Sequence, residues 1–338
     1  MRLNLKASGR IVLSVVVLAL VIAGGFLAYR YVLQPPVKSP ESLTLSTTTS
    51  TYDTGLLDYL LPYFERQYNV KVKVLSLGTG QAIQVAQRGD ADVVLVHSIT
   101  LELPFVNAGY GVHRVGVMYN DFIIIGPKAD PAGIAGTTNT SYAFRRILIT
   151  ATAGNATFIS RADNSGTNVK ELDIWASIGI EPSNKTYSWY LAAGAGMGTV
   201  LRMTNEKKAY TLTDRGTWLS FRDQLTNLEV MTEGDKILLN PYAVIPVNDT
   251  KFPQRNYRMA VSFAKFLIST DGQQLIANYQ RANQSLFIPI ARNYTAAHSL
   301  GFPTQEQEVA WYDSVDPTSF VIALVPTLSN QKTPRLFK

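Results

Sequence analysis

The stretch KVKVLSLGTGQAIQVAQRGDADVVLV at residues 71–96 decides the fold. Residues 71–77 alternate apolar and polar side chains, which is typical of a β-strand with one buried face. They lead into a Gly-Thr-Gly loop, a helix-like segment at 81–88 and a second apolar strand at 92–96. A strand, a short loop, a helix and another strand form a βαβ unit, so this stretch predicts the α/β class with a parallel sheet.

A second set of similar elements follows. Strands are expected at 121–126, 157–160, 210–213 and 240–247, and helices at 141–150, 169–178, 196–205 and 254–269. Pro62 is expected to kink or restart a helix that begins near Thr54. The segment 301–338 contains four prolines and is expected to be an irregular tail.

Three loops rich in hydroxyl groups and glycine each lead into the start of a predicted helix: Thr47-Thr48-Thr49-Ser50, Gly78-Thr79-Gly80 and Ser165-Gly166-Thr167. Helix N-termini present unpaired N–H donors and a partial positive charge, and they therefore bind anions. Arg161 lies just before the third loop and adds a cation with several fixed donors. Together the loops and the arginine predict a site for a small oxyanion.

Each part has a simpler interpretation when it is taken alone. A Thr/Ser run most often caps a helix, and Gly-Thr-Gly is often a tight turn that here lacks the lysine of a P-loop. Arg161, Asp163 and Asp53 could be surface charges, caps or salt-bridge partners, and His97 could be a core histidine. The combination of three donor loops with one arginine is what favours the anion site.

The composition limits the class of protein. With 46% hydrophobic residues the chain can form a packed core, and zero cysteines exclude disulfide scaffolds, thiol nucleophiles and Cys-ligated zinc. Three widely spaced histidines leave little for a His-rich metal site. No Ser/His/Asp pattern is visible, so we expect neither an enzyme nor a bound metal or cofactor.

The N-terminus predicts a membrane anchor. Residues 1–10 are basic and are expected in the cytoplasm, and 11–33 form an apolar segment that reads as a transmembrane anchor or an uncleaved signal. A Pro-rich linker at 34–42 follows. Everything beyond about residue 33 is then expected outside the cell, which six Asn-x-Ser/Thr sequons support: Asn139, Asn155, Asn184, Asn248, Asn283 and Asn293.

The net charge of +6 is concentrated beside this anchor. The 31 Lys and Arg residues, less Arg2, Lys6, Arg10 and Arg30, leave 27 against 25 Asp and Glu, a net charge of +2. So mild a charge argues against nucleic acid or an anionic membrane surface as a partner of the exposed part.

Longer strings of the sequence resemble a known family. Their order along the chain is TTTSTYDTGLLDYLLPYFE (47–65), GTGQAIQVAQRGDADVVLVHS (78–98), VMYNDFIIIGPKADPAGI (117–134), FISRADNSGTNVKELDIW (158–175), GAGMGTVL (194–201), AYTLTDRGTWL (209–219) and EGDKILLNPYAVIPVN (233–248). From about residue 43 to 290 the chain is similar to the tungstate-binding receptors of ABC transporters.

The resemblance implies a type II periplasmic-binding-protein fold, with two lobes that each contain a mostly parallel sheet flanked by helices and with two crossovers. Lobe 1 would comprise 43–126 and 240–300, lobe 2 would comprise 127–239, and 301–338 would be a C-terminal extension. Carried over from the family, the anion-binding residues would be Thr49, Ser50, Arg161, Ser165 and Thr167, with Thr79 as a weaker addition. Ala162 stands where the family usually has glycine. If that position needs a positive φ, alanine would be strained and could move Arg161.

The donors themselves indicate the class of ligand. Tungstate, molybdate and sulfate carry no proton at neutral pH and need donors, whereas hydrogen phosphate also needs an acceptor, which Asp163 or Asp53 could supply. We therefore expect a monomeric receptor that binds tungstate or molybdate and delivers it to an ABC permease. Two alternatives remain open, namely a phosphate or sulfate receptor of the same fold and a membrane-anchored surface enzyme acting on phosphate esters.

Overall fold

The computed structural model describes residues 40–183, 185–281 and 283–317. Its strands are β1 (Glu41–Thr48), β2 (Val70–Leu77), β3 (Val93–Val96), β4 (Val115–Pro127), β5 (Phe158–Ser160), β6 (Tyr190–Ala192), β7 (Thr211–Asp214), β8 (Leu228–Thr232), β9 (Leu239–Pro246), β10 (Gln280–Arg281), β11 (Gln284–Ser285) and β12 (Ile288–Pro289). Its α-helices are α2 (Thr49–Asp53), α3 (Leu56–Tyr68), α4 (Thr79–Gln87), α5 (Ile99–Asn107), α6 (Thr140–Thr152), α7 (Gly166–Ser177), α8 (Met197–Lys207), α9 (Arg215–Phe221), α10 (Tyr257–Ile268), α11 (Thr270–Asn278), α12 (Tyr294–Ser299) and α13 (Gln305–Ser314).

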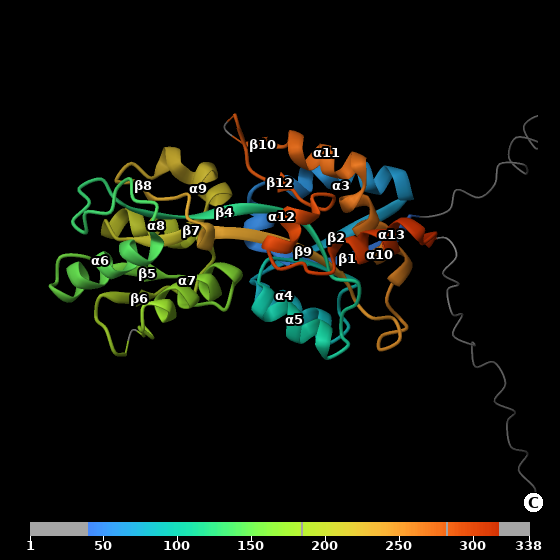
Figure 1. Cartoon of the computed structure of the whole chain (residues 1–338), viewed down its shortest axis with the longest axis horizontal. Helices are drawn as coiled ribbons and strands as arrows, with labels where there is room; N and C mark the ends of the chain where they lie inside the picture. The colour runs from blue at the N-terminus through green and yellow to red at the C-terminus, as the bar shows by residue number, and fades with distance from the viewer. Residues whose placement is uncertain (1–39, 184, 282, 318–338) are drawn as a thin grey trace, which may run out of the picture. The chain divides into compact units, whose positions relative to one another are not determined.

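Two long strands, β4 and β9, connect the two parts of the sheet. The strand order is β12-β4-β9-β3-β1-β2, and β7 and β8 also pair with β4. Residues 115–121 of β4 pair with β9, and from Phe122 onward β4 pairs with β7 and β8. In Figure 1 the elements α6–α9 lie at one end of these two strands and α3–α5 with α10–α13 at the other. The chain thus passes out along β4 and returns along β9.

The sheet is mixed, and the prediction of mostly parallel sheets is wrong in this respect. The pairs β1–β3 and β5–β6 are parallel, as βαβ units require. However, β9 runs antiparallel to both β3 and β4, and β7 and β8 run antiparallel to β4. The physical reason is the return path, because a chain that leaves along one strand and comes back along its neighbour must pair with it in the opposite direction.

A cluster of aromatic rings fixes helix α7, which carries two of the predicted site residues. Trp175 is fully buried, and its ring centroid lies 4.5 Å from that of Phe144 and 5.3 Å from that of Phe158. These rings come from α7, α6 and β5, so they join the helix to the strand that precedes it. The start of α7 is therefore attached to a rigid core.

Two local expectations from the prolines, a helix restart at Pro62 and irregular structure throughout the segment that begins at 301, are wrong. Helix α3 runs through Pro62 without restarting. Within the supposed irregular tail, Gln305–Ser314 form α13, which packs on α10 and buries Val309 and Tyr312. Pro303 precedes this helix and does not interrupt it, so the prolines mark its boundary.

Among the described residues, we find no helix with the length and apolar character needed to span a membrane. The predicted anchor at 11–33, with the basic segment 1–10 and most of the linker 34–42, lies outside the described residues.

Candidate anion-binding site

The Gly78–Gly80 loop and the loop before α7 lie in direct contact. The Gly80 N–H donates to the Asn164 carbonyl oxygen at 3.2 Å, and the Gly166 N–H donates to Thr79 Oγ1 at 3.1 Å. A Cβ on Gly80 would lie 2.3 Å from the Asn164 side-chain nitrogen, so a larger residue would push the loops apart. Thr79 and Gly166, which are in contact, are 87 positions apart in the sequence, so two of the three predicted loops form one surface.

The N-terminus of α7 supplies the third set of donors. Ser165 caps the helix by accepting the Asn168 N–H at 3.2 Å, and its own N–H donates to Asp163 Oδ1 at 3.1 Å. Thr167 is 2% exposed, and its hydroxyl has no hydrogen-bond partner among the described residues. A buried hydroxyl without a partner is costly, so this position indicates a bound group that the protein itself does not provide.

Arg161 lies at the end of β5 and is 3% exposed. Its guanidinium donates to Asp163 Oδ2 from Nη2 at 2.6 Å and from Nε at 3.2 Å. The same Nη2 donates to Thr49 Oγ1 at 3.3 Å. Arg161 thus connects the first predicted loop to the third.

The hydroxyls of the Thr47–Ser50 run have separate roles. Thr47 Oγ1 donates to the Leu95 carbonyl at 2.7 Å, and the Thr48 and Thr51 hydroxyls bond each other at 2.6 Å. These groups hold the start of α2, which leaves Thr49 as the threonine that contacts Arg161. Ser50 belongs to α2, but its side chain lies outside the described part of the structure.

Three carboxyl groups act on Arg161. Asp163 is its direct partner. Burial raises the pKa of Asp214, and the Arg161 charge lowers it. The pKa of Asp53 is raised by burial and by Asp214, while Arg161 lowers it. Asp214 was not predicted from the sequence. It caps α9 by accepting the Thr217 N–H, and an aspartate at the start of a helix is a recognisable signal.

The arrangement is suited to holding a small anion, since the Arg161 guanidinium bonds the Thr49 hydroxyl and is connected through Asp163 to the N-terminus of α7. Of the predicted residues, Thr49 and Arg161 are in contact, and Thr79, Ser165 and Thr167 are joined through Gly166 and the start of α7. Among the described residues, no group of three or more His, Asp or Glu side chains is placed to hold a metal ion.

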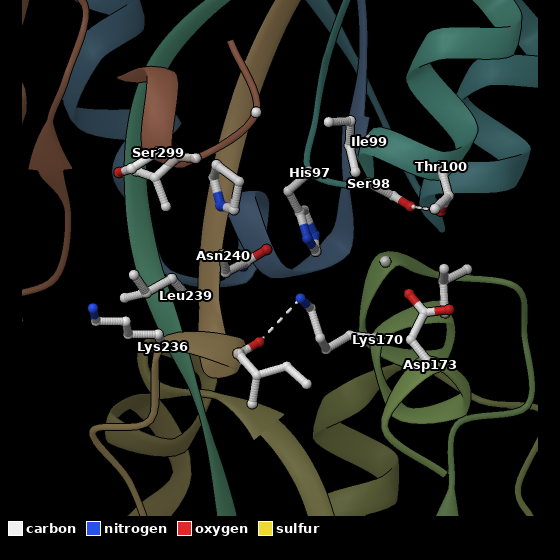
Figure 2. Close-up of a pocket in the computed structure, with 16 residues that line it drawn as sticks. His97, Ser98, Ile99, Thr100, Lys170, Asp173, Lys236, Leu239, Asn240 and Ser299 are labelled. Atoms are coloured by element: carbon white, nitrogen blue, oxygen red, sulfur yellow. Dashed lines mark hydrogen bonds between the residues drawn. The ribbon is translucent and has the colours of Figure 1, made fainter. Parts of the chain in front are cut away.

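A separate cavity of about 310 Å³ lies next to this site. Figure 2 shows His97, Asn240 and Lys170 on its wall, with Lys170 donating to the Ile237 carbonyl at 3.0 Å. Gly166 lines it, but the predicted site residues are not among its lining residues. His97 packs on Tyr242, and burial lowers its pKa to about 3, so it is a neutral core histidine in accordance with the simpler interpretation.

Comparison with known proteins places the chain in a family. A family profile described as the PBP superfamily domain matches residues 35–271. The chain belongs to the PBP superfamily. An ABC transporter anion-binding protein, so named in Haloferax volcanii, is 50% identical to this PBP chain over 75% of the chain and 73% of its own length.

Two further relatives carry tungstate in their names. The tungstate-binding protein TupA of Peptoclostridium acidaminophilum is 44% identical over 74% of the PBP chain and 86% of its own length. The crystal structure of the tungstate ABC transporter from Geobacter sulfurreducens shares 49% identity and superposes with a TM-score of 0.64, covering 71% of this chain and 99% of that one.

Ala162 of the PBP chain adopts the left-handed conformation, with φ 48°. This is the condition under which the sequence predicted strain, because a Cβ disfavours this region by about 1–2 kcal/mol. We expect Ala162→Gly to raise the free energy of unfolding by about 0.5–1 kcal/mol in urea denaturation, after the greater freedom of glycine in the unfolded chain is subtracted. Ala135→Gly is the control, because Ala135 is also exposed but has no positive φ, and it should destabilise. A loss of stability in Ala162→Gly would contradict the strain.

Proposed function

We propose that the chain is an extracytoplasmic receptor that binds tungstate or molybdate and delivers it to an ABC permease. The observation that carries the proposal is the buried Arg161, which contacts Thr49 close to the α7 N-terminus, where the Thr167 hydroxyl lacks a partner within the described part of the chain. The proposed ligand-binding residues are Thr49, Ser50, Thr79, Arg161, Ser165 and Thr167. The chain then acts by binding and release and not as an enzyme.

The state of Asp163 supports a fully deprotonated anion. One of its carboxylate oxygens accepts from Arg161 and the other accepts the Ser165 N–H. Three of its roughly four acceptor positions are therefore taken by protein donors, which leaves Asp163 less available to a proton on the ligand. A site that offers donors favours tungstate, molybdate or sulfate over hydrogen phosphate. The names of the relatives, at 44% and 49% identity, support tungstate within this class.

The arrangement of the chain is part of the proposal. The exchange of partners along β4 and the return along β9 support a lobe 1 of 43–126 and 240–300 and a lobe 2 of 127–239, with the anion held between them. We further propose that 11–33 anchor the receptor, that 34–42 form a linker and that 301–338 are a C-terminal extension. The receptor would act as a monomer on the outer side of the cytoplasmic membrane.

Thermal denaturation of the full-length chain with each anion tests the ligand. A ligand at about 100 times its Kd adds about 2.7 kcal/mol, which for a chain of this size raises Tm by about 4 °C. We expect this shift with tungstate and molybdate, and little or none with phosphate at the same concentration. A shift with phosphate alone would favour the phosphate receptor, and no shift with any of the anions would refute the proposed function.

A further inference from the structure

Glu171 is a fully enclosed carboxyl group in the first half of α7, 2% exposed. Its two oxygens face different partners. Oε1 accepts from Trp175 Nε1 at 3.2 Å and from the Tyr190 hydroxyl at 2.7 Å, whereas Oε2 accepts from the Ser160 hydroxyl at 2.5 Å. Burial raises the pKa of Glu171 to about 7, although these hydrogen bonds lower it. One oxygen thus holds the aromatic core, and the other holds the residue next to Arg161.

Ser160 connects Glu171 to the loop at 161–165, between β5 and α7. Its Oγ accepts the Ala162 N–H at 3.2 Å and the Asn168 Nδ2 at 3.2 Å. A hydroxyl oxygen has two acceptor positions, so both are used and its proton is left for Glu171. Asn168 Oδ1 in turn accepts the Asn164 N–H at 3.1 Å.

The network ends on the two strained residues of the loop. Ala162 and Asn164 both have positive φ, 48° and 55°. They flank Asp163, and Ala162 follows Arg161 directly, so their conformations set where the guanidinium and its partner point. Such conformations persist when surrounding bonds hold them in place. Here those bonds are the two N–H donations to Ser160 and Asn168.

We propose that Glu171 is a positioning residue for the anion site, which directs the Ser160 proton and thereby fixes the loop that carries Arg161. This inference rests on the proposed function for its ligand. The charge of Glu171 is essential to it. Glu171→Gln keeps the shape of the side chain, but its amide nitrogen donates and must face either Ser160 or the side of Trp175 and Tyr190. Facing Ser160, it needs an acceptor, which Ser160 provides by releasing Ala162 or Asn168. Ser160→Ala removes the acceptor of both Ala162 and Asn168 whichever way the amide lies.

Hydrogen exchange without any ligand tests the positioning role. We expect the amides of Ala162 and Asn164 to exchange at least about tenfold faster in Glu171→Gln and in Ser160→Ala, because local opening becomes easier when their acceptors are displaced. Trp175→Phe is the matched control, since it removes an N–H donor from Oε1 and leaves the Ser160 bond to Oε2 in place. It should lower Tm without changing exchange at these two amides.

Calorimetric titration with tungstate then tests whether the conformation of the loop affects the Kd. Apparent affinity falls with the fraction of molecules whose loop is in the binding conformation. We expect this fraction to drop to about a tenth in Glu171→Gln and in Ser160→Ala, which raises the Kd about tenfold. The double variant should be little weaker than either single one, because both act through the same bond. Trp175→Phe should bind within about threefold of the parent chain.

The pH profile separates positioning from a general loss of packing. Burial raises the pKa of Glu171 to about 7, so the parent chain should bind tungstate more weakly at pH 6 than at pH 8, and Glu171→Gln should lose this difference. The other titratable side chains on α7 and on the elements packed against it are Lys170, Asp173, Tyr142, Arg145, Arg146, Tyr190 and Asp214. All of these remain in Glu171→Gln, so any pH dependence that they cause would persist there.

The outcomes are distinct. Unchanged exchange at Ala162 and Asn164, or an unchanged Kd and pH profile in Glu171→Gln, would overturn the positioning role. If the parent chain binds neither tungstate nor molybdate, the proposed function fails, and the exchange measurement still decides whether Glu171 holds the loop.

Discussion

Replacing Arg161 with alanine is expected to weaken tungstate binding by roughly 1000-fold, or about 4 kcal/mol. Hydrogen bonds to a charged group contribute about 1.5–3 kcal/mol each, and the bonds of Nε and Nη2 to Asp163 and Thr49 leave the two N–H groups of Nη1 to donate to a dianion. The loss is enlarged because Asp163 would then be unpaired at the site, where its negative charge repels the ligand. Isothermal titration calorimetry of the full-length chain measures the effect.

Two further variants make this result specific. Arg161→Lys keeps the charge but not the planar fork, so its affinity should fall between those of the parent chain and Arg161→Ala. Arg292→Ala removes an arginine that pairs with Asp313 at 2.8 Å, with both side chains largely exposed, and it should leave the Kd unchanged. If Arg161→Ala bound tungstate within threefold of the parent chain, the anion would have to lie elsewhere.

The fold could be predicted where local patterns decide it. Residues 71–96 form β2, α4 and β3 close to the expected bounds, because alternation and glycine placement are local properties. The antiparallel path of β9 beside β4 was not visible, since pairing between distant strands depends on the whole topology. Helix α13 was not predicted, because the four prolines of 301–338 indicated an irregular tail, whereas Pro303 and Pro317 lie on either side of the helix.

In the candidate site, too, the residues with local sequence signals could be predicted and the contacts between distant residues could not. Arg161, Ser165 and the hydroxyl loops stand out in the sequence, because a helix start has a local signature. The contact of Gly80 with Asn164 and the packing of Glu171 among Ser160, Trp175 and Tyr190 require the fold. A glutamate within the helical segment 166–177 looks like an ordinary surface residue in the sequence, and its burial becomes apparent when β5 and β6 are placed beside it.

Replacing Glu102 with alanine is expected to lower the free energy of unfolding by about 3–5 kcal/mol, with anion binding retained in the folded fraction. Glu102 accepts the Ser98 N–H at 2.7 Å and forms two bonds with Arg114, to Nε at 2.8 Å and to Nη2 at 2.7 Å. The two side chains are 1% and 8% exposed, so the variant leaves the guanidinium charge buried and unpaired. Urea denaturation measures the loss.

Two further variants separate the cost of the unpaired buried charge from the cost of the lost contacts. Asp90→Ala removes a partner of Arg88 in an exposed pair at 3.1 Å and should change stability by less than about 1 kcal/mol. The double variant Glu102→Leu with Arg114→Met removes both charges and keeps apolar volume beside Phe302, over whose ring Arg114 lies at 4.2 Å. Because the cost arises from one unpaired buried charge, the double variant should recover most of the stability that Glu102→Ala loses. A double variant as unstable as Glu102→Ala would instead show that the hydrogen bond to Ser98 and the contacts of Arg114 with the segment at Gly301 hold this region together.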